Sequence, residues 1–224
     1  MTATDIDRRN RDAEALLRAA RILPIVTADS VDEALAVSRA LLEGGLSAIE
    51  LTLRTPAALA ALAALKRELP DVSVGAGTVL DARQLHEAQA AGADFIVTPG
   101  TTPSLREALA ACSLPVVAGV ATPSEAMVLR EHGFRVAKLF PAAAVGGLGM
   151  LKALQGPLPD MLFCPTGGIG EADAADYLAQ PNVACIGGSW MVPKAWLQAG
   201  EWTRVRESAA RARAIIDRVD ARAG

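Results

Sequence analysis

The chain has 224 residues, of which 51% are hydrophobic and 21% charged, and its formal net charge is −3 at pH 7. A weakly acidic chain without a basic block does not favour nucleic acid, and no uninterrupted apolar run approaches the ~18 residues that a membrane span needs. The N-terminal segment is charged and lacks an apolar secretory signal. We therefore expect a cytoplasmic protein with neither a membrane nor a nucleic acid as partner.

Short apolar segments alternate with amphipathic segments along the whole chain, a pattern typical of a parallel sheet covered by helices. An N-terminal helical extension over residues 1–20, with helical periodicity near 8–20, is expected first. Strands are expected near residues 22–26, 47–53, 72–76, 94–98, 115–119, 135–140, 161–165 and 183–187. Eight strand–helix units predict a single (β/α)8 TIM barrel domain over residues 1–224.

Helix boundaries are marked by Thr-Pro pairs and by glycines. The Thr-Pro pairs at 55–56, 102–103 and 122–123 each place a capping hydroxyl before proline at the first helical position. Glycines expected just after helix ends are Gly45, Gly92 and Gly133. These signals concern the fold and carry no chemistry.

Lys138 lies within the apolar segment 135–142, which is predicted to be a buried strand. Burial disfavours the charged form of a lysine, and the neighbouring sequence offers no counter-charge. An uncharged lysine is a nucleophile toward carbonyl carbon and forms Schiff bases. The other lysines lie in polar or charge-tolerant settings: Lys66, Lys152 and Lys194. Lys138 is therefore the candidate nucleophile.

The second predicted strand carries polar side chains on one face. Because strand side chains alternate, Ile49, Leu51 and Leu53 pack outward on helices, whereas Glu50, Thr52 and Arg54 point into the barrel. Glu50 would then share a cavity with Lys138 and move protons during imine chemistry. Arg54 has the geometry to hold a substrate carboxylate. A structural ion pair at a solvated barrel end is the alternative.

Glycine-rich turns follow three predicted strands. Segments 164–169 and 186–189 end the seventh and eighth strands, where barrels frequently bind phosphate, and Thr166 and Ser189 add hydroxyl groups. Each segment alone is also compatible with a plain tight turn. Segment 75–78 ends the third strand but lacks the third glycine of a dinucleotide fingerprint, so no nicotinamide cofactor is expected.

Six motifs together resemble the 2-dehydro-3-deoxy-6-phosphogluconate (KDPG) and 4-hydroxy-2-oxoglutarate (KHG) aldolase family, over about residues 22–202. They are Ile49-Glu-Leu-Thr-Leu-Arg-Thr55, Gly75-Ala-Gly-Thr78, Val97-Thr-Pro-Gly100, Lys138-Leu-Phe-Pro-Ala142, Phe163-Cys-Pro-Thr-Gly-Gly168 and Ile186-Gly-Gly-Ser-Trp190. The resemblance implies a class I aldolase of the Entner–Doudoroff route that needs no metal or organic cofactor. It also implies a (β/α)8 barrel, a small phosphorylated 2-keto-3-deoxy sugar acid as substrate, and a homotrimer.

The resemblance also implies roles for named residues. Lys138 would form the Schiff base, and Glu50 would be the general acid and base. The pyruvyl group would be held by Arg54, Thr78, Pro99 and Phe140, and the distal phosphate by Thr166, Gly167, Gly168, Gly188 and Ser189. Family members often carry a polar residue where this chain has Ala143-Ala-Val145, so the sequence leaves substrate preference open.

Three alternatives to KDPG cleavage stay open at this point. The first is a sibling aldolase acting on KHG or on 2-dehydro-3-deoxy-6-phosphogalactonate. The second is a phosphate-binding barrel isomerase or epimerase that uses Glu50 without forming an imine. The third is a non-catalytic barrel that binds sugar phosphates.

Overall fold

Eight parallel strands form the centre of the molecule. The computed structural model describes residues 3–223. Residues 1, 2 and 224 of the predicted domain lie outside the described residues, and the assignment of the chain to one domain stays a prediction. The strands are β1 (Ile22–Val26), β2 (Ala48–Thr52), β3 (Ser73–Gly77), β4 (Phe95–Val97), β5 (Val116–Val120), β6 (Val136–Leu139), β7 (Leu162–Phe163) and β8 (Ile186–Gly188).

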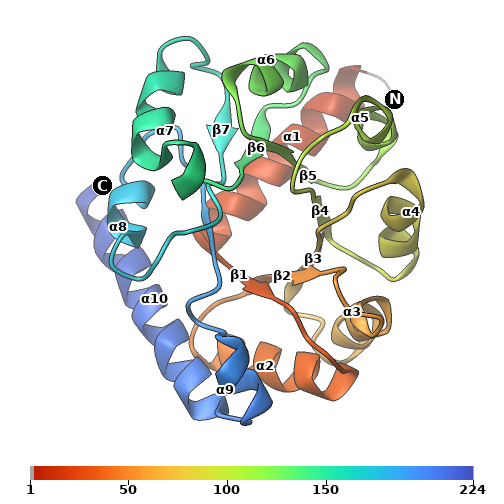
Figure 1. The fold of residues 1–224 in the computed structure, drawn as a ribbon, viewed down its shortest axis with the longest axis vertical. Coiled ribbons are helices and arrows are strands. Elements are labelled where there is room, and N and C mark those ends of the chain that lie inside the picture. Colours follow the sequence, from red (N-terminus) through yellow and green to blue (C-terminus); the bar gives the residue numbers. More distant parts are fainter. Residues whose placement is uncertain (1–2, 224) are drawn as a thin grey trace.

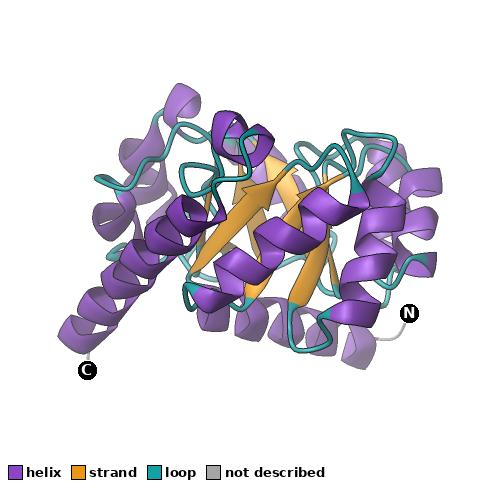
Figure 2. Cartoon of the chain, turned by 90° about the horizontal axis from the view of Figure 1, so that it is seen from below, coloured by secondary structure: helices purple, strands orange, loops and turns teal. Residues whose placement is uncertain are grey.

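The sheet is closed into a barrel. Its strand order is β7-β6-β5-β4-β3-β2-β1-β8, and parallel bridges from Phe163 to Val183 and from Thr166 to Gly187 join the two outermost segments. The ring of strands is visible in Figure 1, and Figure 2 shows the strands crossing the middle of the molecule with helices around them. The predicted (β/α)8 barrel is therefore confirmed.

Strands β7 and β8 depart most from the sequence prediction, whereas the ends of the other strands lie within one residue of it. The seventh is shorter than 161–165, and the eighth is 186–188 instead of 183–187. Pro165 lacks a backbone N–H and interrupts the ladder, although Gly187 N still donates to Pro165 O at 2.9 Å. Val183 pairs with Phe163 only as an isolated bridge, so the strand assignment begins later.

Helices cover the outside of the barrel. They are α1 (Ala3–Ala20), α2 (Val31–Glu43), α3 (Ala58–Glu68), α4 (Ala82–Ala90), α5 (Pro103–Ala111), α6 (Pro123–Glu131), α7 (Gly147–Gln155), α8 (Ala174–Leu178), α9 (Lys194–Gln198) and α10 (Trp202–Ala223), with a 3-10 turn at Ala143–Val145. None of these described helices combines the length and apolarity that a membrane span requires.

The predicted helix caps are mostly confirmed. Thr102 and Thr122 cap α5 and α6, the latter with a complete capping box to Glu125. The glycines at 45, 92 and 133 have left-handed φ angles of 90°, 90° and 82°. The cap expected at Thr55 is wrong, because α3 begins at Ala58 and the Thr55 hydroxyl instead donates to Ala28 O at 2.7 Å.

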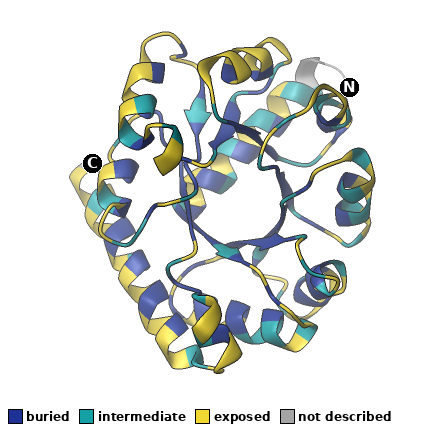
Figure 3. Ribbon diagram, viewed as in Figure 1, coloured by how far each residue is buried: buried dark blue, intermediate teal, exposed yellow. Residues whose placement is uncertain are grey.

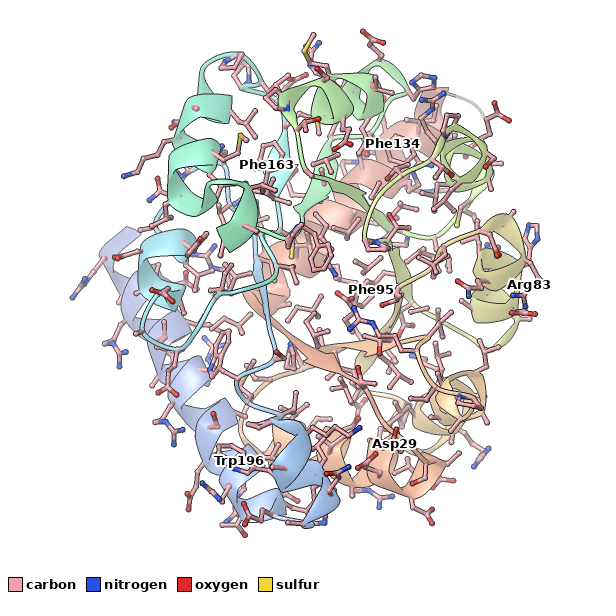
Figure 4. All side chains as sticks on the ribbon, viewed as in Figure 1. Asp29, Arg83, Phe95, Phe134, Phe163 and Trp196 are labelled. Atoms are coloured by element: carbon pink, nitrogen blue, oxygen red, sulfur yellow. The ribbon has the colours of Figure 1, made fainter. Side chains whose placement is uncertain are left out.

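Two apolar clusters hold the fold together. The larger one lies between the strands and the surrounding helices and includes Ile49 and Leu51, which is why each helix in Figure 3 has one buried face. The smaller one fills the barrel interior, with Phe95 pointing into the centre of the ring (Figure 4). Gly75 leaves room for that ring, since a Cβ there would lie 2.5 Å from Phe95 Cδ2.

The N-terminal helix α1 closes one end of the barrel and crosses behind it in Figure 1. Its Ala13 and Leu17 belong to the interior cluster. Arg9 is 2% exposed, donates to Leu109 O at 2.8 Å, and lies 4.5 Å from the ring centroid of Phe134. The other end of the barrel, where the strands terminate, is left open for a site.

Candidate active site

Lys138 on β6 and Glu50 on β2 form a buried ion pair inside the barrel. Lys138 Nζ lies 2.9 Å from Glu50 Oε1 and 3.1 Å from Oε2. Their side chains are only 5% and 2% exposed. Lys138 is thus desolvated, and the counter-charge that its neighbouring sequence lacks comes from Glu50, which strand alternation placed in the same interior. Its partner lies 88 residues earlier in the chain and reaches it only because the barrel closes.

Glu50 occupies space that Gly77 leaves empty. Gly77 ends β3 and pairs with Thr52. A Cβ at Gly77 would lie 2.5 Å from Glu50 Cγ and 2.8 Å from Glu50 Cδ, well inside van der Waals contact. Gly77 therefore lets the carboxylate lie against β3 while it reaches Lys138.

A cavity of about 490 Å³ opens above this pair, at the carboxyl ends of the strands. Its lining residues come from the ends of β1, β2, β6, β7 and β8 and from the segments that follow them. They are Ile25, Thr27, Asp29, Glu33, Arg54, Lys138, Phe140, Thr166, Gly167, Gly168, Ile169, Gly187, Gly188, Ser189, Val192, Pro193, Lys194 and Leu197. The cavity is large enough for a small organic substrate.

Arg54 and Thr78 are neighbours at the mouth of the cavity. Arg54 Nε donates to Thr78 Oγ1 at 3.0 Å, which leaves the two terminal nitrogens of the guanidinium available for a carboxylate. Thr78 has a left-handed φ of 61°. Phe140 lines the cavity, and its ring centroid is 5.5 Å from Lys138 Nζ.

Three predicted site residues do not line this cavity. Glu50 lies below it, hydrogen-bonded to Lys138. Thr78 lies behind Arg54, which lines the cavity and donates a hydrogen bond to the Thr78 hydroxyl. Pro99 lies on the segment after β4, where its backbone packs against Gly119, at which a Cβ would lie 2.6 Å from Pro99 O.

The two glycine turns form one wall of the cavity. Gly167 and Gly168 have left-handed φ angles of 99° and 75°, which other residues rarely adopt. Gly187 makes room for Thr166, because a Cβ there would lie 2.9 Å from Thr166 Cγ2. The predicted phosphate residues Thr166, Gly167, Gly168, Gly188 and Ser189 are thereby brought together. Glycine backbone and hydroxyl donors facing one cavity suit an anion.

The sequence matches the model of one protein family, described as KDPG and KHG aldolase, over residues 13–208. The chain belongs to the KDPG and KHG aldolase family. The resemblance carried by the six motifs is thereby confirmed.

Aldolases from three bacteria are similar along most of the chain. A 2-dehydro-3-deoxy-phosphogluconate aldolase from Pseudomonas aeruginosa is 47% identical, over 90% of this chain and 91% of its own. A KHG/KDPG aldolase from Escherichia coli is 42% identical, over 88% and 92%. The KDPG aldolase of Legionella pneumophila, with pyruvate captured at low pH as a covalent carbinolamine intermediate, has a TM-score of 0.86 at 41% identity, over 88% and 96%.

Two thiols of this aldolase-family chain belong to the barrel interior that holds the pair. Cys164 and Cys185 are buried and unbonded to one another. Burial raises the pKa of the Cys185 thiol well above its usual value, with the neighbouring Cys164 adding to the shift. A raised pKa keeps the Cys185 thiol protonated, so Lys138 is favoured over Cys185 as the nucleophile.

Sequence reasoning missed four polar residues of the cavity: Thr27, Asp29, Glu33 and Lys194. Thr27 follows β1, and its hydroxyl lies 2.7 Å from that of Thr52. Its position just past a barrel strand is a signal that sequence reasoning can use. Asp29 and Glu33 surround the start of α2, and Lys194 begins α9, so these three depend on how the helices pack.

Proposed function

We propose that this chain is a class I aldolase that cleaves KDPG to pyruvate and glyceraldehyde 3-phosphate. The observation that carries the proposal is the buried Lys138–Glu50 contact of 2.9 Å directly below a cavity. A lysine that can pass a proton to a carboxylate is able to attack a ketone. Membership of the family and the 47% identity to a named KDPG aldolase support the same reaction.

The first half of the reaction forms an imine. Glu50 takes a proton from Lys138, and the free amine attacks the C2 ketone, so a C–N bond forms and the carbonyl electrons move to oxygen. The attacking nitrogen passes a proton to this oxygen, which gives a neutral carbinolamine with a C2 hydroxyl. When Glu50 returns the proton that it took from Lys138 to this hydroxyl, the C2–O bond breaks and water leaves. The product is a protonated imine on Lys138, with the substrate carboxylate at Arg54.

The second half breaks and resolves the carbon chain. The C4 hydroxyl loses its proton to Glu50, the C3–C4 electrons move into the imine, and glyceraldehyde 3-phosphate departs. The remaining enamine is protonated at C3. Water then hydrolyses the imine, which releases pyruvate and restores the Lys138 amine. The electron sink is the imine itself, and no redox step is needed.

The proposed substrate lies with its ends at opposite sides of the cavity. Arg54, Thr78, Pro99 and Phe140 would surround the pyruvyl group, with Arg54 binding the carboxylate through two hydrogen bonds. The distal phosphate would be bound by Thr166, Gly167, Gly168, Gly188 and Ser189. A second activity on KHG is supported by the E. coli relative, whose name includes both substrates. The isomerase or epimerase alternative has no such support.

We also propose a homotrimer in the cytoplasm, as the family resemblance implies. Large apolar side chains exposed on the described surface include Leu80 at 53% and Met127 at 51%, and a subunit interface would cover such residues. Sedimentation velocity tests this directly: a trimer supports the proposal, and a monomer at micromolar concentration contradicts it.

Turnover tests the proposed function. Purified protein is mixed with KDPG, and pyruvate release is followed with lactate dehydrogenase. The same assay is run with 2-dehydro-3-deoxy-6-phosphogalactonate and with KHG as substrates. We expect fastest cleavage of KDPG, no turnover by Lys138→Met, and normal turnover by Lys152→Met, whose side chain is exposed on α7. Absence of pyruvate release with every one of these substrates would reject the aldolase assignment.

A further inference from the structure

The charge balance of the cavity leaves the phosphate end short of positive charge. A phosphate monoester carries about −1.5 to −2 at pH 7. Among the cations that line the cavity, Lys138 is paired with Glu50 and Arg54 is at the pyruvyl end beside Thr78. The glycine turns supply neutral donors only. Two carboxylates, Asp29 and Glu33, line the same cavity and repel an arriving anion.

Lys194 is the third cation that lines the cavity. It is exposed and makes no side-chain hydrogen bond or ion pair within residues 3–223, unlike Lys66, which is bound to Asp94 at 2.7 Å. It also follows the phosphate turn closely in sequence, five residues after Ser189. The backbone between them is fixed by Val192 N donating to Ser189 O at 3.1 Å.

The helix that carries Lys194 faces the acidic start of α2. Another surface depression lies between the two helices, with Asp29 and Glu33 on one side and Leu197 and Gln198 on the other. Figure 4 shows Asp29 and Trp196 of α9 on the same side of the barrel. The Asp29 backbone N–H donates to Glu33 Oε2 at 2.5 Å, which holds the Glu33 carboxylate beside the loop before α2. Among the described residues that line this cavity, Lys194 is thus a cation without a partner group, and it can offset these carboxylates when phosphate enters.

We propose that Lys194 binds the distal phosphate and sets the preference of this enzyme for phosphorylated over non-phosphorylated 2-keto-3-deoxy acids. This inference rests on the proposed function and assigns a further residue to the same site. Lysine serves phosphate as a flexible point charge, and no fixed partner has to be given up before Lys194 reaches the substrate. Because Lys194 touches only the distal group, it affects binding and not the imine steps.

The test compares KDPG with its non-phosphorylated analogue, 2-dehydro-3-deoxygluconate. For Lys194→Met we expect the KM for KDPG to rise about tenfold with kcat unchanged, the size of effect of one solvated charge on a dianion. The KM for the analogue should not change. Lys194→Arg should restore most of the affinity for KDPG, and Lys152→Met on α7 should leave both substrates unaffected. The effect of Lys194→Met should shrink at high salt.

A binding measurement separates this inference from the proposed function. Calorimetry with glycerol 3-phosphate, an unreactive phosphate monoester, should give a weaker Kd for Lys194→Met than for the unchanged protein. If the unchanged protein cleaves KDPG while Lys194→Met alters neither the KM nor this Kd, the role of Lys194 is wrong and the aldolase assignment stands. If Lys194→Met raises the KM for KDPG and the KM for its non-phosphorylated analogue by the same factor, the inference is also wrong. If no substrate is cleaved but Lys194→Met still weakens binding of glycerol 3-phosphate, the phosphate site stands and the aldolase assignment fails.

Discussion

Removing one charge from the Lys138–Glu50 pair is expected to destabilise the fold strongly. With exposures of 5% and 2%, both side chains are largely shielded from solvent that could replace a lost partner. Breaking such a buried pair costs about 3–5 kcal/mol, so Glu50→Gln and Lys138→Met should each lower the free energy of unfolding by about that amount. The double variant removes both charges, and its loss should fall short of the sum of the single losses by about 2 kcal/mol or more.

The assay is urea unfolding followed by far-UV circular dichroism at one protein concentration for all variants. Arg130→Met is the control, because the Arg130–Asp160 pair, at 2.7 Å, is no longer than the buried pair at 2.9 Å but is 45% and 37% exposed. Breaking this exposed pair should lower the free energy of unfolding far less than either substitution in the buried pair. Losses below about 1 kcal/mol for both single variants, or additive losses in the double variant, would refute this reasoning about the buried pair.

Three further predictions concern the surroundings of the pair. Gly77→Ala places a methyl group against Glu50. The displaced carboxylate should reduce kcat about 100-fold, while the circular dichroism spectrum stays unchanged. An unchanged kcat would contradict this packing. Arg54→Met should raise the KM for KDPG about 10- to 100-fold, as expected for the loss of hydrogen bonds to a charged group. It should not weaken the binding of glycerol 3-phosphate. A weaker Kd for glycerol 3-phosphate would mean that the substrate lies in the opposite orientation. Because burial raises the pKa of Cys185, this thiol should not react with a thiol reagent until the protein unfolds, and a fast reaction of native protein at Cys185 would show it to be accessible.

Much of the fold could be predicted because its signals are local. Apolar alternation fixed which face of β2 points inward, and the prolines after Thr102 and Thr122 marked helix starts. Thr55 carries the same Thr-Pro signal, yet its hydroxyl contacts Ala28, which is 27 residues away. A tertiary hydrogen bond therefore overrode a local one.

The candidate site was predictable in its residue types but not in its contacts. Alternation placed Glu50 and Lys138 in the same interior, whereas their 2.9 Å contact depends on closure of the sheet. Lys194 has a polar setting in sequence and no strand periodicity, and it becomes a site residue only because α9 packs at the cavity. The space that Gly77 provides for Glu50 likewise exists only in the folded barrel.

The central claim is that the Lys138 amine forms a covalent bond with a ketone inside the barrel. Borohydride reduction in the presence of pyruvate, followed by digestion and mass spectrometry, tests it most directly. We predict one reduced pyruvyl adduct per chain, on the peptide that contains Lys138, and none in the Lys138→Met variant. An unmodified Lys138 peptide at saturating pyruvate, or an adduct on another lysine, would contradict the claim.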